Sequence, residues 1–261
     1  MSSYIENRPE LGMKIEWENV TIQDQVKTAR GTFVEMVHRP NWGVACYMDN
    51  QIQSCERDEA IYHTALVHPA LTSSACKKRV MIIGGGEGAT LREVVKWKEV
   101  EKIDMYEWDK DVITLFQTKY PQWAKGAWED PRVTLYHDDI FAVISQAPSH
   151  KYDVIIVDLF DPSEENKKEW TILCNRLADW SKEEGIITMY AGIRTPQSEL
   201  LTILHESRLM NRIITPYYVY IPSFSGESLF FMLSDHEANI EKKESSSPPY
   251  QARAHTQFIS W

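Results

Sequence analysis

The hydrophobic pattern of the chain changes character near residue 57. Residues 14–53 alternate apolar and polar positions, with Val, Ile, Thr, Tyr and Phe placed between turn signals such as Arg39-Pro40-Asn41. A period of two is typical of half-buried strands. Residues 58–71 instead space their apolar side chains as a helix does, with Asp58 and Glu59 in the first turn. We therefore expect a small antiparallel β domain over residues 1–56.

From Arg79 onward, short apolar runs alternate with amphipathic segments. Strands are predicted at 80–86, 102–109, 132–139, 152–161 and 185–192, and helices at 89–97, 111–120, 169–184 and 198–209. Two late strands, 214–222 and 228–235, are predicted to form a hairpin. Short buried strands that alternate with helices are typical of a doubly wound α/β sheet, which we assign to residues 57–240. Residues 241–261 are polar and contain Pro-Pro and Ser-rich runs, which predicts a tail.

Composition narrows the class of protein. The chain has 261 residues, a formal net charge of −10, 43% hydrophobic and 25% charged residues, which is ordinary globular usage. An acidic protein repels phosphate backbones, so we expect no nucleic-acid partner. The four cysteines are far apart, which favours a reducing compartment over a zinc or iron–sulfur site. No signal peptide and no apolar run of about 18 residues is present, so a cytoplasmic protein without a membrane partner is expected.

Glycines and carboxylates gather where the predicted strands end. The loop Gly84-Gly85-Gly86-Glu87-Gly88 follows the first parallel strand and opens a helix. The next three strands end in acids, which are Glu107, Asp138 with Asp139, and Asp158. The carboxyl ends of parallel strands form the edge at which open α/β sheets bind ligands, and an acid in the position of Glu107 can hold ribose hydroxyls. The alternative is that these acids are helix N-caps and solvated loop charges.

Glu87 indicates the charge of the ligand. A dinucleotide such as NAD would set a pyrophosphate on the glycine loop, against the negative charge of Glu87. A nucleoside with a cationic substituent suits the same loop, and S-adenosyl sulfonium compounds are such ligands. S-adenosylmethionine carries a carboxylate that Glu87 would repel, whereas its decarboxylated form carries only an amine. At about 4 Å and an effective dielectric of about 20, this difference amounts to several kcal/mol.

Taken together, the motifs resemble one enzyme family. The pattern Q-x-x-x-x-D-E-x-x-Y-H from Gln53 to His63, the run GGGEGATLREV, the run DLFDP and the late IPSFSGESLFFML occur in order. They resemble the polyamine aminopropyltransferases, which are the spermidine, spermine and thermospermine synthases, over about residues 15–235. The runs YHTALVHPAL and IPSF, and Glu in the glycine loop, resemble the thermospermine synthase branch most.

The resemblance implies a fold, a reaction and a set of site residues. It implies a Rossmann-like domain, similar to class I methyltransferases, behind the N-terminal β domain, in homodimers or homotetramers. It implies a polyamine substrate, decarboxylated S-adenosylmethionine as co-substrate, no further cofactor and no metal. Asp158 is the candidate catalytic residue. The candidate donor-binding residues are Gln53, Gly84, Gly86, Glu87, Glu107, Asp138 and Asp139, and the candidate acceptor-binding residues are Tyr62, His63, Asp161, Tyr190 and Phe224.

The chain departs from the family pattern at the acceptor end. Tyr190 stands where the family usually has Gln, and Phe224 stands where it usually has an acceptor-contacting Tyr. The loop after Asp161 reads SEENKKEW rather than a G-P-x-x-x-L pattern. The resemblance favours spermidine as acceptor. Putrescine as acceptor, a small-molecule methyltransferase on the same core, and a non-catalytic polyamine or nucleoside binding protein remain the alternatives.

Overall fold

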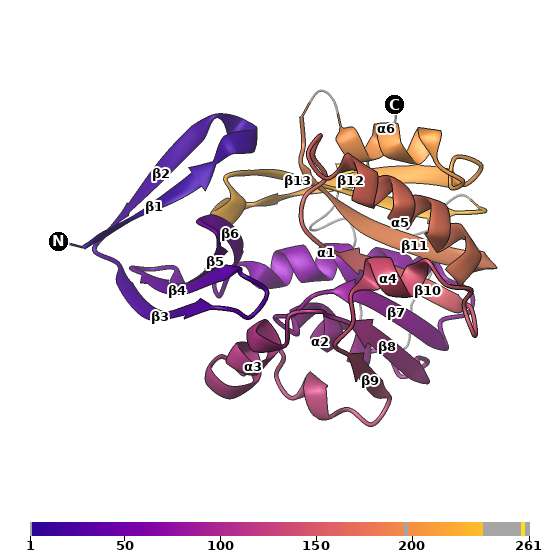
Figure 1. Ribbon diagram of the computed structural model, residues 1–261, viewed down its shortest axis with the longest axis horizontal. Helices are drawn as coiled ribbons and strands as arrows, with labels where there is room; N and C mark the ends of the chain where they lie inside the picture. The colour runs from indigo at the N-terminus through magenta and orange to yellow at the C-terminus, as the bar shows by residue number, and fades with distance from the viewer. Residues whose placement is uncertain (1, 196–197, 237–256, 259–261) are drawn as a thin grey trace.

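The computed structural model describes residues 2–195, 198–236 and 257–258 (Figure 1). Its N-terminal part is all antiparallel. Strands β1 (Ser3–Arg8) and β2 (Met13–Glu18) form a two-stranded sheet, joined by a short 3-10 turn, η1 (Pro9–Leu11). Strands β3 (Thr21–Lys27), β4 (Phe33–Arg39), β5 (Gly43–Met48) and β6 (Gln51–Cys55) form a second sheet in chain order. The predicted antiparallel β part is confirmed, and β1 is an additional strand that the sequence analysis missed.

The rest of the chain forms one sheet with helices on both faces. The helices are α1 (Glu59–Ser73), α2 (Ala89–Val95), α3 (Lys110–Lys119), α4 (Ile140–Ile144), α5 (Lys167–Trp180) and α6 (Glu199–Glu206). The strands are β7 (Arg79–Gly84), β8 (Lys102–Tyr106), β9 (Val133–Tyr136), β10 (Tyr152–Asp158), β11 (Ser181–Ile193), β12 (Ile213–Ile221), β13 (Gly226–Ser234) and β14 (Gln257–Phe258). Short 3-10 turns are η2 (Ala127–Glu129) and η3 (Pro222–Phe224).

The strand order of this sheet locates a ligand-binding edge. The order is β14-β12-β13-β11-β10-β7-β8-β9, in which β11 to β9 run parallel and β12 to β14 pair antiparallel. The chain winds from β7 outward to β9 and then returns to β10 on the other side of β7. The neighbouring strands β7 and β10 therefore connect onward in opposite directions, to β8 and to β11. Two such strands open a crevice at their carboxyl ends. The predicted doubly wound, Rossmann-like sheet and its late hairpin are thus confirmed.

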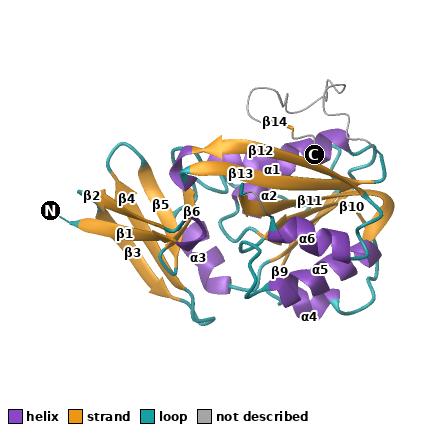
Figure 2. Cartoon of the chain, turned by 90° about the horizontal axis from the view of Figure 1, so that it is seen from above, coloured by secondary structure: helices purple, strands orange, loops and turns teal. Residues whose placement is uncertain are grey.

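Alternation along the central strands divides the core into two layers. Val80 and Ile82 of β7 pack toward α1 and α2, whereas Met81 and Ile83 pack toward α4, α5 and α6. Strand β10 follows the same alternation, with consecutive buried apolar residues that face opposite helix layers. Figure 2 shows α4, α5 and α6 on one side of this sheet. Both faces are covered, which is why these strands read as continuous apolar runs rather than alternating ones.

The four-stranded sheet is anchored to the main domain by α3. Val34 and Met36 of β4 and Cys46 of β5 lie in one apolar cluster with Phe116 of α3 and with Trp123, which follows α3. The backbone N–H of Ala29, in the β3–β4 turn, donates to Asp111 in the first turn of α3. The N-terminal sheet is therefore fixed at the carboxyl end of the main sheet, next to the crevice.

One local prediction differs from the structure, and one helix was not predicted. The helix predicted for 169–184 ends at Trp180, because Ser181 already pairs with Tyr152 at the start of β11. The exposed residues 182–184 then bulge out of the ladder before Ile186 resumes it opposite Val154. Helix α4 was not predicted. Of the predicted tail 241–261, only Gln257 and Phe258 lie within the described residues, where they pair with β12.

No described helix is long and apolar enough to cross a membrane.

Candidate active site

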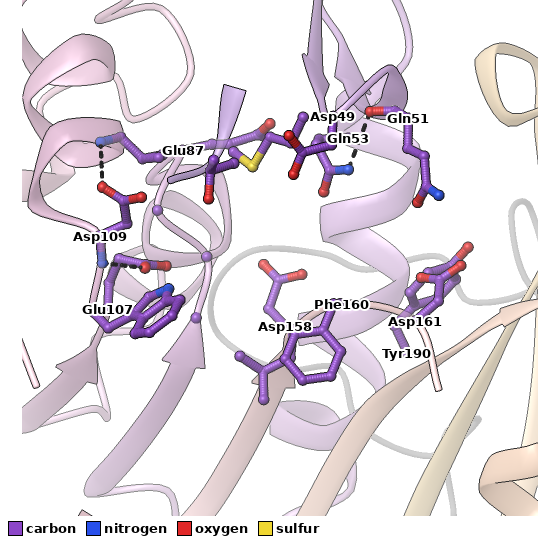
Figure 3. Close-up of a pocket in the computed structure, with 18 of the residues that line it drawn as sticks. Asp49, Gln51, Gln53, Glu87, Glu107, Asp109, Asp158, Phe160, Asp161 and Tyr190 are labelled. Atoms are coloured by element: carbon purple, nitrogen blue, oxygen red, sulfur yellow. Dashed lines mark hydrogen bonds between the residues drawn. The ribbon is translucent and has the colours of Figure 1, made fainter. Parts of the chain in front are cut away.

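A cavity of about 840 Å³ lies between the N-terminal sheet and the carboxyl ends of the main sheet. Every candidate residue from the sequence lines it, namely Gln53, Tyr62, His63, Gly84, Gly86, Glu87, Glu107, Asp138, Asp139, Asp158, Asp161, Tyr190 and Phe224. Figure 3 shows Glu107 toward one end, Asp161 and Tyr190 at the other, and Asp158 between them. The fold therefore brings together residues that are spread over more than half of the chain.

The glycine loop lines the cavity and packs directly against the end of β10. Gly84 ends β7 at a φ of +80°, and a Cβ there would lie 2.1 Å from the carbonyl oxygen of Asp158. The same carbonyl accepts a hydrogen bond of 3.1 Å from the backbone N–H of Gly85. A side chain at position 84 would thus push β7 and β10 apart. Glycine at this position is what allows the loop to lie against the end of β10.

Two hydroxyl groups hold the carboxylate of Asp158. Tyr62 on α1 donates to Oδ1 at 2.7 Å, and Thr90 at the start of α2 donates to Oδ2 at 2.5 Å. Both donors come from helices packed on the same face of the sheet. Because each carboxylate oxygen has its own donor, the carboxylate is held in one orientation. Thr90 is fully buried and was not a sequence candidate. A carboxylate fixed in this way presents its remaining lone pairs to the cavity in one orientation.

Aromatic rings form the wall beside Asp158. The ring of Tyr62 lies 5.1 Å from that of Tyr190, 5.8 Å from Phe224 and 5.6 Å from Phe230, measured between centroids. Phe224 lies on η3, which is tied to the start of α1 by the Ser223 N–H that donates to Asp58. Burial, together with the charge of Asp158, raises the pKa of Tyr62 far above its ordinary value, so its hydroxyl keeps its proton.

Glu87 lies on the opposite side of the cavity and is almost fully buried. Its Oε1 accepts a hydrogen bond of 2.7 Å from Ser54 Oγ, and its Oε2 lies 4.0 Å from Nε2 of His63. Burial raises the pKa of Glu87 to about 7, against the lowering effects of His63 and Ser54. A buried carboxylate that ionises near neutral pH gains from a cationic partner, which is what an amine of a ligand would supply.

Behind Glu87, a buried ion-pair network orients His63. Nδ1 of His63 donates a hydrogen bond of 2.9 Å to the carboxylate of Glu59. The same carboxylate accepts one hydrogen bond of 2.9 Å from each terminal nitrogen of Arg92. Burial opposes a charge on His63, yet Glu59 raises the pKa of His63 above its usual value. His63 is thus held with Nε2 toward Glu87. The ring of His63 also lies 4.9 Å from that of Tyr62, measured between centroids, and its predicted part in acceptor binding stays a prediction.

Glu107 lies at the far end of the cavity, directly after β8. Its Oε1 accepts the backbone N–H of Asp109 at 2.9 Å, and a Cβ at Gly86 would lie 3.1 Å from its Oε2. Burial, with the negative charges of Asp109 and Asp158, raises the pKa of Glu107 to about 7. The glycine loop and this carboxylate therefore line one end of the cavity, where two ribose hydroxyls could be bound by Glu107.

The exposed carboxylates differ in their local roles. Asp139 is the N-cap of α4 and accepts the backbone N–H of Phe141 at 2.9 Å, so the capping alternative describes this residue. Asp138 lies beside it with an exposed side chain. Asp161 is also exposed, and its Oδ2 lies 3.6 Å from the Cβ position of Gly192 on β11. Asp161 thus lies near Tyr190, as Figure 3 shows.

The N-terminal strands contribute residues that the sequence analysis missed. Asn7, Arg8, Asp49 and Gln51 line the cavity with Gln53, whose amide donates to the carbonyl of Gln51 at 3.2 Å. Their elements begin up to 150 residues before β10, and no local motif marks Asn7 or Arg8. The short distance of Gln51 and Asp49 from Gln53 in the sequence is the signal that could have identified them.

The lining is strongly acidic. The basic residues that line the cavity are Arg8 and His63. Ten carboxylates line it with them, namely Asp49, Glu87, Glu107, Asp109, Asp138, Asp139, Asp158, Asp161, Glu165 and Glu169. Such a field attracts a ligand with several positive charges. Within the described ranges, no cluster of three or more His, Cys, Asp or Glu side chains has the arrangement of a metal site. The geometry suits an elongated cation that carries a nucleoside at one end.

Comparison with known proteins identifies the family of this chain. The sequence model of the spermine/spermidine synthase domain matches residues 59–244. The chain belongs to this family. It is 32% identical over 223 residues to a polyamine aminopropyltransferase of Aeropyrum pernix, a match that covers 82% of this chain and 70% of that protein. It is 37% identical over 204 residues to one of Pyrobaculum aerophilum, covering 76% and 70%. The chain is an aminopropyltransferase, as the resemblance implied.

Solved structures share the fold. A spermidine synthase from Thermotoga maritima has a TM-score of 0.74 at 23% identity and covers 92% of this chain and 81% of its own. A spermidine synthase in complex with the transition-state analogue AdoDATO has a TM-score of 0.82 at 21% identity, covering 97% and 89%. These likenesses confirm the Rossmann-like fold of the aminopropyltransferase. The thermospermine branch and the oligomeric state stay predictions.

Proposed function

We propose that this aminopropyltransferase moves the aminopropyl group of decarboxylated S-adenosylmethionine to an amine of spermidine. The observation that supports the proposal is the position of Asp158, in one acidic cavity, between Glu87 with Glu107 on one side and the aromatic wall on the other. This order matches a reaction in which a nucleoside donor and an amine acceptor meet at one carbon.

At the donor end, the charges match a sulfonium compound without a carboxylate. Glu107 would bind the ribose hydroxyls, with Asp138 near the adenine amino group and Gln53 over the donor. Glu87 would pair with the amine of the aminopropyl chain, because a buried carboxylate next to the glycine loop has cavity on one side and Ser54 on the other. S-adenosylmethionine would bring a second carboxylate to this point, which the acidic lining repels.

The reaction is a displacement at carbon. The lone pair of the acceptor nitrogen attacks the propyl carbon next to sulfur, the C–S bond breaks with its electrons going to sulfur, and neutral methylthioadenosine leaves. The attacking amine must be unprotonated, although a free polyamine amine has a pKa of about 10. Asp158, held by Tyr62 and Thr90, would accept or relay that proton and aim the nitrogen lone pair. Alignment of the two substrates supplies a further share of the rate.

The donor assignment has a direct test. The purified protein is incubated with spermidine and either decarboxylated or ordinary S-adenosylmethionine, and methylthioadenosine and the polyamine products are separated by chromatography. We expect methylthioadenosine and a tetraamine only with the decarboxylated donor. Transfer of a methyl group from ordinary S-adenosylmethionine would establish the methyltransferase alternative. Binding of both ligands with no product would establish a non-catalytic binding protein.

The acceptor end predicts a preference for the longer amine. Tyr62, Tyr190 and Phe224 offer aromatic faces to the methylene and cationic segments of a polyamine, and Asp161 lies at the exposed end. We expect spermidine to give a kcat/KM at least about tenfold above that of putrescine, which equals about 1.4 kcal/mol. Side-by-side steady-state kinetics with the two amines measure the ratio. A higher kcat/KM for putrescine would show that the enzyme is a spermidine synthase with an unusual acceptor wall.

A further inference from the structure

Two buried side chains behind Glu87 take no part in the reaction described above. Ser54 on β6 is 2% exposed, and Trp123, after α3, is 1% exposed. Nε1 of Trp123 lies 3.0 Å from Ser54 Oγ, which lies 2.7 Å from Oε1 of Glu87. The three residues come from separate parts of the chain and meet in one hydrogen-bonded row. We call Trp123 and Ser54 the Trp123–Ser54 pair.

The chemistry of the indole fixes the direction of this row. An indole N–H can only donate, so Ser54 Oγ accepts from Trp123. The hydroxyl has a single proton, and the carboxylate of Glu87 is the acceptor within reach of it. Ser54 therefore donates to Glu87 and cannot turn its proton elsewhere without losing a buried hydrogen bond. Such an interaction favours the charged form of the carboxyl group.

Trp123 is held rigidly enough to maintain this geometry. Its ring meets those of Phe116 and Tyr120 edge to face, with centroids 5.5 Å and 6.0 Å apart. Its carbonyl oxygen accepts a hydrogen bond of 2.6 Å from Arg92, which is itself paired with Glu59. The indole is thus fixed on its ring and on its backbone, while Ser54 is placed by the pairing of β6 with β5.

Other ionisable groups also face Glu87. His63 from α1 lies 4.0 Å from its Oε2, and Glu59, on the far side of His63, adds a negative charge. Asp158 at the end of β10 opposes ionisation of Glu87 through its own charge. Cys46 from β5 also lies against Glu87, and burial together with this carboxylate raises the pKa of the Cys46 thiol well above its usual value. Ser54, through its hydrogen bond, and His63, through its charge, both lower the pKa of Glu87 and so favour the ionised carboxylate.

We propose that the Trp123–Ser54 pair positions Glu87 for the donor. It fixes one carboxylate oxygen by a directed hydrogen bond, so that Glu87 meets the amine of the donor ionised and in one orientation. Ser54 and Trp123 are positioning residues in this role, since Ser54 acts through Glu87 and Trp123 acts through Ser54. The inference rests on the proposed function, because it takes the decarboxylated donor as the ligand of Glu87.

The test removes the hydroxyl and follows donor binding against pH. Burial raises the pKa of Glu107 to about 7 as well, so the affinity for decarboxylated S-adenosylmethionine is compared with that for methylthioadenosine, which shares the ribose. In the wild type, this ratio of affinities is expected to rise between about pH 6 and pH 8, as Glu87 ionises. In Ser54→Ala, the midpoint of this rise moves up by about one pH unit, and the affinity at pH 7 falls by about tenfold. Methylthioadenosine, which lacks the amine, should bind the variant within about twofold of the wild type. Calorimetry measures both ligands.

Two further variants separate positioning from general damage. Trp123→Phe keeps an aromatic ring but removes the N–H, and the midpoint of its pH profile should shift in the same direction by a smaller amount. The double variant of Ser54→Ala and Trp123→Phe should differ little from Ser54→Ala alone. Ser207→Ala is the matched control, since Ser207 is a buried serine that donates to Leu204 at the end of α6. This control should leave the affinity and the pH profile for both ligands unchanged.

The outcomes distinguish the inference from the function on which it rests. An unshifted midpoint in Ser54→Ala, in a wild type that binds the decarboxylated donor, overturns the role of the pair and leaves the function standing. An equal loss of methylthioadenosine binding also overturns it, since the hydroxyl then supports the cavity as a whole. A wild type that does not bind the decarboxylated donor rejects the proposed function and the positioning role together.

Discussion

Replacing Asp158 with asparagine is expected to lower kcat by about 10²–10⁴, which is the usual contribution of a positioned general base. The substitution keeps the size of the side chain but removes its charge, so the proton of the attacking amine has no acceptor. An amide NH2 group replaces one of the two carboxylate oxygens, and this group cannot accept the hydrogen bond that Tyr62 or Thr90 donates. Donor binding should change little, because Asp158 lies beyond the residues assigned to the nucleoside. Steady-state kinetics at saturating substrates, with calorimetry of the donor, measure the two effects.

Asp153 offers a matched control on the same strand. It is buried at the opposite end of β10, where it accepts from Lys182 at 2.6 Å and from the backbone N–H of Arg79 at 2.8 Å. Asp153→Asn should lower thermal stability while kcat stays near the wild-type value. Near wild-type turnover in Asp158→Asn would show that the Asp158 carboxylate only supports the structure.

Substituting Glu87 with glutamine should change which donor is preferred. The variant loses the charge that pairs with the amine, so its affinity for decarboxylated S-adenosylmethionine should fall by about 10- to 100-fold. Affinity for ordinary S-adenosylmethionine should rise, because the repulsion of its carboxylate is removed. Burial raises the pKa of Glu87 to about 7, so lowering the pH below 7 protonates this carboxyl group. Acid should therefore weaken donor binding more in the wild type than in the variant, in which Glu107, whose pKa burial also raises to about 7, leaves a smaller dependence on pH.

Calorimetry with both donors across this pH range decides the assignment. Glu93→Gln serves as the control. Glu93, on α2, is also a buried glutamate, but it pairs with His68, Lys96 and Arg92 rather than lining the cavity. It should reduce stability and leave the ratio of the two donor affinities unchanged. An unaltered donor preference in Glu87→Gln would mean that the amine is bound elsewhere.

Some of the N-terminal sheet could not be predicted from the local pattern. Strand β1 turns Glu6 and Arg8 inward, and polar residues at inward positions hide the alternation that marks a strand. Glu6 can be buried because it accepts from the indole of Trp17 at 2.9 Å and from the hydroxyl of Tyr47 at 3.3 Å. These partners lie 11 and 41 residues away in the chain. No window of a few residues contains the information that makes this strand stable.

The end of α5 shows the same limit in another form. The helical pattern continues through residues 181–184, so the sequence favoured a helix to residue 184. In the structure, Ser181 pairs with Tyr152 of β10, and Gly185 lies so close to this contact that a Cβ there would be 2.6 Å from Ser181 Oγ. The pairing with a distant strand, rather than local propensity, decides where the helix stops.

The sequence by itself determined the class of fold and the edge of the sheet at which the candidate carboxylates gather. Apolar runs that end in glycine or acid mark parallel strands, and parallel strands bring their carboxyl ends to one edge, so Glu87, Glu107 and Asp158 had to lie near one another. Only the tertiary structure decided which side chains hold them. Ser54 donates to Glu87 from 33 residues away, Thr90 donates to Asp158 from 68 residues away, and Trp123 donates to Ser54 across 69 residues. Hydrogen bonds over such separations depend on how the elements pack, and packing leaves no periodic trace in the sequence.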